Sequence, residues 1–136
     1  MADLAIVFEA GELACALPAV DLREILETAH VSPAPMAPAA IEGVLNRLGR
    51  LYVVFDLGSL VVSALCARSR LLLFGHDTFA FAAWVDGVLG VADMEADRVA
   101  DEGDPVPFQR ALLGYQGRRV PLLDAEALFR RVDELI

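Results

Sequence analysis

The stretch Ile41–Leu57, IEGVLNRLGRLYVVFDL, decides the fold of this chain of 136 residues. It contains a small-residue turn at Gly43, a polar pair, Asn46 and Arg47, and a second turn at Gly49. A run of β-forming residues follows, and an Asp-Leu pair ends it. This order predicts short strands joined by tight turns rather than long helices.

The N-terminal segment continues this pattern. Leu4–Phe8 and Leu13–Leu17 are apolar runs of strand length on either side of Gly11, which predicts a hairpin. The segment Ala19–Leu26 places its apolar residues at i, i+3 and i+4, so it predicts a short amphipathic helix. Three prolines within residues 33–38 then predict an extended connector.

The remaining elements are also short. Asp56 is placed to cap a helix over residues 57–67, and Asp124 is placed to cap a last helix in which Leu128, Val132 and Leu135 repeat. Between them we expect strands at 71–74, 79–85, 88–91, 111–115 and 119–123, with turns at 75–78, 86–87 and 116–118 and an acidic loop at 93–104. Many short strands with two or three short helices predict a mainly β, barrel-like architecture.

Composition narrows the function classes. A formal charge of −9 disfavours binding to nucleic acid and to anionic membrane surfaces. We see no targeting signal, and Asp56 interrupts the most apolar stretch, so direct membrane insertion is not expected and the cytoplasm is the expected compartment. The hydrophobic fraction of 57% is enough for a core and for an apolar contact surface.

No catalytic or metal-binding pattern is present in the sequence. His30 and His76 have no partner at a metal-ligand spacing, and the chain contains no lysine. The acidic loop matches part of a calcium-binding template but has Arg98 where that template needs glycine. We therefore expect no cofactor and no enzymatic activity.

Six segments, read in order, resemble the CheW-like coupling domains of bacterial chemosensory arrays, and the resemblance runs from about Leu4 to Val132. They are the turn Gly11-Glu12, the segment Leu17–Leu26, the connector Val31–Pro35, the pattern Gly43-Val44-Leu45-Asn46 with Asp56-Leu57, the segment Ala83–Val88, and the closing pair Leu113-Gly114-Tyr115 and Leu122-Leu123-Asp124.

The resemblance implies one domain over residues 1–136, made of two five-stranded SH3-like barrels that share a core and divide near residues 66–70. It implies a scaffold that joins the cytoplasmic tips of methyl-accepting chemoreceptors to the regulatory domain of a CheA-type histidine kinase. On matching positions, it places Leu22, Glu24, Gly43 and Asn46 at or near the partner surfaces. We add Arg47 and Leu48 as partner-binding candidates.

The central motif departs from the family. The family usually reads Asn-Leu-Arg-Gly, whereas this chain has Asn46-Arg47-Leu48-Gly49. From the period-two alternation of a strand, we expect Leu48 to face the interior or an apolar groove and Arg47 to face solvent or a partner. The exchange brings receptor binding into question more than it does the fold.

Two other functions remain open at this point. A small-ligand-binding β-barrel would use the apolar excess to line a cavity that carries a few convergent polar groups. A hydrolase would need a serine beside His30 or His76, and no nucleophile motif supports it. A non-catalytic adaptor is the interpretation that the order of the segments favours.

Overall fold

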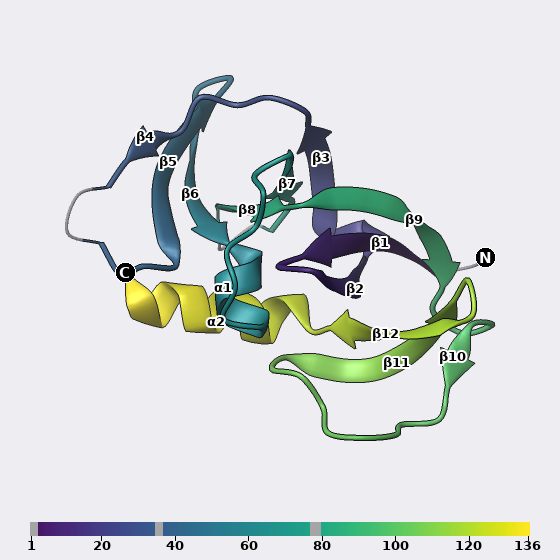
Figure 1. Ribbon diagram of the computed structural model, residues 1–136. Helices are drawn as coiled ribbons and strands as arrows, with labels where there is room; N and C mark the ends of the chain where they lie inside the picture. Colours follow the sequence, from purple (N-terminus) through teal and green to yellow (C-terminus); the bar gives the residue numbers. More distant parts are fainter. Residues whose placement is uncertain (1–2, 35–36, 77–79) are drawn as a thin grey trace.

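The computed structural model describes residues 3–34, 37–76 and 80–136, and these form two β-sheets and two α-helices (Figure 1). The first sheet has the strand order β10-β11-β12-β2-β1-β9 and consists of β1 (Leu4–Ala10), β2 (Leu13–Pro18), β9 (Gly87–Asp93), β10 (Arg98–Val99), β11 (Gln109–Tyr115) and β12 (Arg118–Leu123). The second has the order β3-β7-β8-β6-β5-β4 and consists of β3 (Leu22–Leu26), β4 (Ser32–Pro33), β5 (Ile41–Arg47), β6 (Arg50–Asp56), β7 (Arg70–Phe74) and β8 (Phe81–Val85). The helices are a 3₁₀ turn η1 (Ala19–Asp21), α1 (Leu57–Val61) and α2 (Ala125–Leu135).

The mainly β fold with two subdomains is confirmed, but the sheets are not closed five-stranded barrels. Each sheet has six described strands, because a two-residue strand, β10 or β4, is added at one edge. No backbone ladder among the described strands joins the two edges of a sheet. Side chains approach across each opening instead: the Tyr115 hydroxyl donates to the Leu89 carbonyl in the first sheet, and Arg47 pairs with Glu24 in the second.

The chain passes between the sheets twice. It leaves the first sheet after β2, builds the whole second sheet, and returns at β9. These crossings fall at residues 18–22 and 85–87, because β9 joins β1 and not its sequence neighbours in the second sheet.

The predicted helix over Ala19–Leu26 is wrong. Only residues 19–21 turn, as a 3₁₀ helix, and residues 22–26 form β3, which pairs with β7. Along β3, half-buried residues alternate with the exposed Arg23 and Ile25. The backbone pairing offered by β7 outweighs a weak local helix preference, which tertiary context commonly overrides.

Helix α1 begins where expected but ends at Val61 instead of near Ala67. Its N-cap is Asp56, whose carboxylate accepts from the Ser59 N–H at 3.0 Å. The following loop is bound by two carboxylates and cannot continue the helix: the Cys66 N–H donates to Asp56 and the Ala67 N–H donates to Asp86. Asp86 also accepts from the Glu12 N–H, which ties this loop to the β1–β2 turn.

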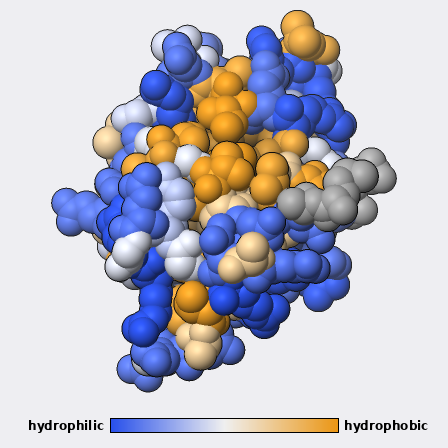
Figure 2. All heavy atoms as spheres, turned by 90° about the vertical axis from the view of Figure 1, so that its right-hand side faces the viewer, coloured by the Kyte–Doolittle hydropathy of each residue, from blue (hydrophilic) through white to orange (hydrophobic). Residues whose placement is uncertain are grey.

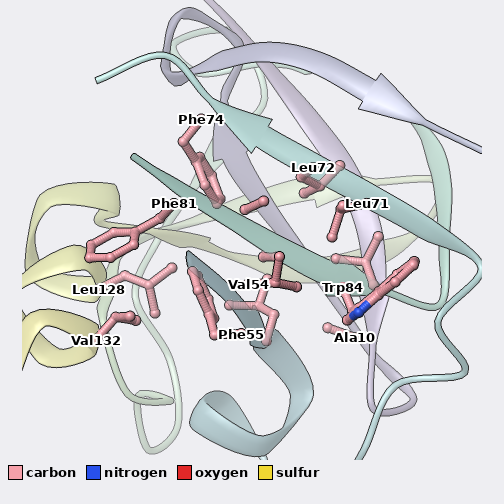
Figure 3. Packing of buried hydrophobic residues seen from close by; sticks show 14 of the residues in the cluster. Ala10, Val54, Phe55, Leu71, Leu72, Phe74, Phe81, Trp84, Leu128 and Val132 are labelled. Carbon is pink, nitrogen blue, oxygen red and sulfur yellow. The ribbon is translucent and has the colours of Figure 1, made fainter. Parts of the chain in front are cut away.

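A single large core joins the two subdomains, as expected. Its buried residues come from β1, β2 and β12 of the first sheet and from β5–β8 of the second. Helix α2 follows β12 in sequence but packs on aromatic residues of the second sheet, with the Phe129 ring 4.7 Å from Phe74 and 5.6 Å from Phe81. Figure 3 shows Leu128 and Val132 of α2 beside Phe81 in this core. A smaller cluster of Ala, Val and Leu fills the interior of the first sheet.

The other predicted elements are present where they can be compared. The 11–12 and 116–117 turns close hairpins, and Asp124 caps α2 by accepting from the Ala127 N–H at 3.1 Å. The acidic loop contains the short strand β10. Residues 35–36 of the proline connector and residues 77–79, which hold part of the expected 75–78 turn and the expected start of β8, lie outside the described residues.

Candidate protein-docking site

The centre of the candidate site is an ion pair between Glu24 on β3 and Arg47 at the end of β5. Arg47 donates from Nε to Oε1 at 3.1 Å and from Nη2 to Oε2 at 2.5 Å, which is a bidentate geometry. Both side chains are about one-third exposed, at 36% and 38%. The guanidinium hydrogen bonds lower the pKa of Glu24, and the carboxylate in turn raises the pKa of Arg47. The pair therefore stays ionised at neutral pH and presents a fixed, accessible fork.

The turn beside this pair holds the other polar candidate. Asn46 is exposed, and its side-chain oxygen accepts from the Gly49 N–H at 3.0 Å. Leu48 and Gly49 both have positive φ, 52° and 85°, as in a two-residue type I′ turn. Asn46 thus stabilises the turn that contains Leu48 and Gly49.

The expected orientation of Leu48 is wrong. Its side chain is 90% exposed, because β5 ends at Arg47 and Leu48 is the first turn residue rather than the next strand residue. Strand alternation does not continue through a turn. The expectation that Arg47 faces outward agrees with its partial exposure, although its guanidinium is held by Glu24.

Leu48→Asn is expected to stabilise the protein by about 1 kcal/mol, since asparagine tolerates positive φ better than leucine and Asn-Gly is a favoured type I′ sequence. Urea unfolding of the two proteins would measure the difference. Leu51→Asn serves as the control, because Leu51 is also exposed but lies within β6. A loss of stability in Leu48→Asn would mean that the leucine packs on the protein.

The remaining two candidates, Leu22 and Gly43, have structural roles in the described residues. Leu22 is half-buried, lies opposite Phe74 in the β3–β7 ladder and packs against the core. Gly43 is buried, and a Cβ at this position would lie 1.9 Å from the Ser32 carbonyl oxygen. Gly43 therefore permits β4 to pair with β5 and offers a partner no side chain.

An apolar surface at the junction of the sheets was not predicted residue by residue. It consists of Leu4, Ile6, Val20 and Val91: Ile6 lies directly opposite Val91 between β1 and the edge strand β9, and Leu4 shares a hollow with Val20. Val20 is 85% exposed and Val91 is 52% exposed. Figure 2 views this side of the molecule and shows hydrophobic side chains gathered across its middle. The sequence signal that could have predicted this surface is Val88-Leu89-Gly90-Val91, an apolar run without polar alternation.

Comparison with known proteins identifies the family. Residues 4–133 match the sequence profile of the CheW-like domain. The chain belongs to the CheW-like domain family. The fold also matches the crystal structure of the scaffolding protein TtCheW from Thermoanaerobacter tengcongensis, with a TM-score of 0.77, 18% identity, and coverage of 91% of this chain and 90% of that chain. At this identity the structural similarity establishes the CheW fold. No curated protein matches the sequence.

In this CheW-like domain, the six partner-binding candidates fall into two groups. Glu24, Asn46, Arg47 and Leu48 meet at the tip of the β5–β6 hairpin, where Arg47 reaches β3. Leu22 and Gly43 support the strands behind that tip. The exchange of Arg and Leu in the central motif therefore leaves a guanidinium bound to Glu24 and adds an exposed leucine beside it.

The described part of this CheW-like domain contains no cluster of three or more His, Cys, Asp or Glu side chains that could hold a metal ion. In the acidic loop, Asp93 accepts from the Glu95 and Ala96 N–H groups, which lowers its pKa and commits it to the turn.

Burial raises the pKa of the Cys66 thiol to about 12 and that of Cys15 further, so both thiols are protonated and poor nucleophiles at neutral pH. In the described residues, no helix combines the length and apolar character needed to cross a membrane.

Proposed function

We propose that this chain is a non-catalytic adaptor that couples chemoreceptors to a CheA-type histidine kinase in a bacterial chemosensory system, acting in the cytoplasm. The observation that carries the proposal is the CheW-like match over residues 4–133. Two surface features support it. An apolar surface lies at the junction of the sheets, and an exposed bidentate ion pair lies at the β5–β6 tip.

The proposed partners are the regulatory domain of the kinase and the cytoplasmic tip of a methyl-accepting chemoreceptor. Helical receptor tips can pack on a surface such as Leu4, Ile6, Val20 and Val91, because an amphipathic helix buries an apolar face in this way. The Glu24–Arg47 pair and Leu48 would lie at or near such a contact. Side chains that are already held in place lose little conformational freedom on binding.

For the small-ligand-binding alternative, the described residues offer an apolar hollow of about 420 Å³ between β5, β6 and the end of α2, but no polar side chain among them lines it to orient a ligand. The interior of the first sheet is filled by Ala, Val and Leu side chains, and the aromatic residues of the second sheet pack on α2. The apolar excess of the sequence therefore goes to a shared core and to exposed surface.

Co-purification with the chemoreceptors and histidine kinase of the source organism tests the adaptor function directly. Affinity-tagged protein should recover both partners from lysate, and the purified components should reassemble. Recovery of neither, together with stoichiometric binding of a small metabolite by the pure protein, would favour the ligand-binding alternative.

Arg47→Ala is expected to weaken partner binding by about 30-fold if Arg47 is a hot spot, while the protein unfolds close to wild type because exposed ion pairs contribute little to stability. Because the pKa of Glu24 is lowered, the ion pair is fully formed at any pH above the ordinary carboxyl range. It is lost only as the pH falls through the lowered pKa. Binding should therefore be unchanged from pH 8 to pH 6. Isothermal titration of each partner would measure both effects.

The exchanged pair, Glu24→Arg with Arg47→Glu, is the matched control. It restores the ion pair across the β3–β5 opening with the charges reversed. If the pair acts only by closing the sheet, the exchange recovers wild-type binding. If a partner contacts the guanidinium itself, binding stays weak although the thermal melt is close to that of wild type.

A further inference from the structure

A second surface lies on the first sheet and its turns, and it is separate from the β5–β6 tip of the second sheet. It is a hollow of about 800 Å³ where β10 lies beside the end of β11 and the start of β12, at the lower right of Figure 1. We call it the arginine hollow, and its lining includes Arg98, Gly114, Tyr115, Gly117, Arg118 and Arg119.

The arginine hollow gathers three arginines in a chain that is acidic as a whole. The sequence has 20 acidic residues and 11 arginines, and six of these arginines form ion pairs within the described structure. Arg119 is one of them, with Nη1 2.8 Å from a Glu102 oxygen. Arg98 and Arg118 are two of the five arginines that form no ion pair with a described residue, although carboxylates outnumber guanidiniums almost two to one.

The carboxylate that lines the hollow is already engaged. Asp97 Oδ2 accepts from the Asp93 N–H at 2.7 Å, and the Asp97 carbonyl accepts from the Gly114 N–H at 2.7 Å. Both contacts hold the turn before β10 in place. With Arg119 paired to Glu102, two guanidiniums and one carboxylate remain in the described lining, so the hollow keeps a surplus of one positive charge.

The walls of the arginine hollow are fixed before any ligand arrives. The Tyr115 hydroxyl donates to the Leu89 carbonyl at 2.9 Å, which holds the ring in place. Gln116 and Gly117 both have positive φ, 47° and 78°, so they form a tight turn between β11 and β12. Gly114 and Gly117 add no side chain, which leaves the space open.

We propose that the arginine hollow docks an acidic segment of a protein partner, with the Arg98 and Arg118 guanidiniums donating to Asp or Glu side chains of that segment. A guanidinium fork matches a carboxylate bidentately, and two forks on one hollow suit acidic residues spaced along an extended peptide. Nucleic acid is disfavoured, since a net charge of −9 repels a continuous phosphate backbone.

A titration followed by amide NMR tests the proposal on the full chain and needs neither kinase nor receptor, so its outcome is separate from that of the adaptor function. The probe is a synthetic decapeptide that alternates Glu and Gly, and the comparison peptide replaces each Glu with Gln. Saturable shifts are expected for the Gly114 and Gly117 amides with the Glu peptide, weakening as NaCl is added, and none are expected with the Gln peptide.

Paired variants then assign the effect to the two arginines. Arg98→Ser with Arg118→Ser should raise the Kd of the Glu peptide about tenfold or more. Arg130→Ser with Arg131→Ser removes the same charge from the exposed face of α2 and should leave the Kd within about twofold, because neither residue lines the hollow and salt screens exposed charges. Urea unfolding of both double variants checks that each is folded. If the variant at Arg98 and Arg118 is unfolded, the single variant Arg118→Glu takes its place.

Three results would overturn the proposal. The first is the absence of shifts in the hollow with the Glu peptide, and the second is an equal loss of affinity in the α2 control. The third is inorganic phosphate producing the same shifts at the same concentration of charge, which would make the hollow a small-anion site instead of a peptide site.

Discussion

Asp56→Ala is expected to lower the free energy of unfolding by about 3 to 6 kcal/mol, because it removes charge-assisted hydrogen bonds from two backbone groups worth about 1.5 to 3 kcal/mol each. Asp56 is the one buried charged residue among those described, at 0% exposure. Its carboxylate accepts from the Ser59 N–H at 3.0 Å and from the Cys66 N–H at 3.0 and 3.2 Å. Without it, the start of α1 and the returning loop lose their common acceptor. Urea unfolding followed by circular dichroism measures the loss.

Asp124→Ala is the matched control for this effect. Asp124 also caps a helix, but within the described residues its carboxylate accepts from a single backbone N–H, that of Ala127, and it is partly exposed. Loss of an ordinary N-cap costs about 1 kcal/mol. If the two variants lose equal stability, the Cys66 contact contributes nothing and Asp56 is no more than a helix cap.

Phe129→Ala is expected to cost about 3 to 5 kcal/mol, the usual range for deleting a buried phenylalanine side chain. Phe129 is 1% exposed. Its ring joins α2 to Phe74 on β7 and to Phe81 on β8, two strands of the second sheet. It is thus a main contact by which the end of the chain stabilises a sheet built from its middle. Thermal and urea unfolding should show one cooperative transition at lower stability.

Glu126→Ala on the same helix provides the comparison. Glu126 is exposed and pairs with Arg130 one turn away, and such pairs contribute about 0.5 kcal/mol or less. A Phe129→Ala protein that unfolds like Glu126→Ala would show that α2 does not belong to the shared core. Two separate transitions would show that the subdomains unfold independently.

Much of the local structure could be predicted from the sequence. Gly11 and Gly117 occupy turns with positive φ, 60° and 78°, a conformation in which glycine meets little strain. Asp56 and Asp124 cap the helices that follow them, since an aspartate side chain reaches the first free N–H groups of a helix. These features depend on residues within four positions of one another, and that is the range that a sequence pattern reports.

The candidate site was predictable only in part. Glu24, Asn46 and Arg47 are on the surface, as their polarity suggests, but the contact between Glu24 and Arg47 joins residues 23 positions apart. Leu48 was assigned to the wrong environment, because a one-residue difference in where a strand ends decides whether the next side chain lies inside or outside. No local signal gives that boundary to one residue.

By itself, the sequence determined the strand-rich character, the hairpin turns, the helix caps and, through the order of its segments, the CheW-like family. The tertiary structure alone decided that residues 22–26 form a strand, that β9 returns to β1, and that Arg98 and Arg118 face one hollow. The physical reason is the range of the interactions. Turns and caps are satisfied by near neighbours, whereas a backbone ladder or a shared hollow exists only after distant segments have been brought together and can then outweigh a weak local preference.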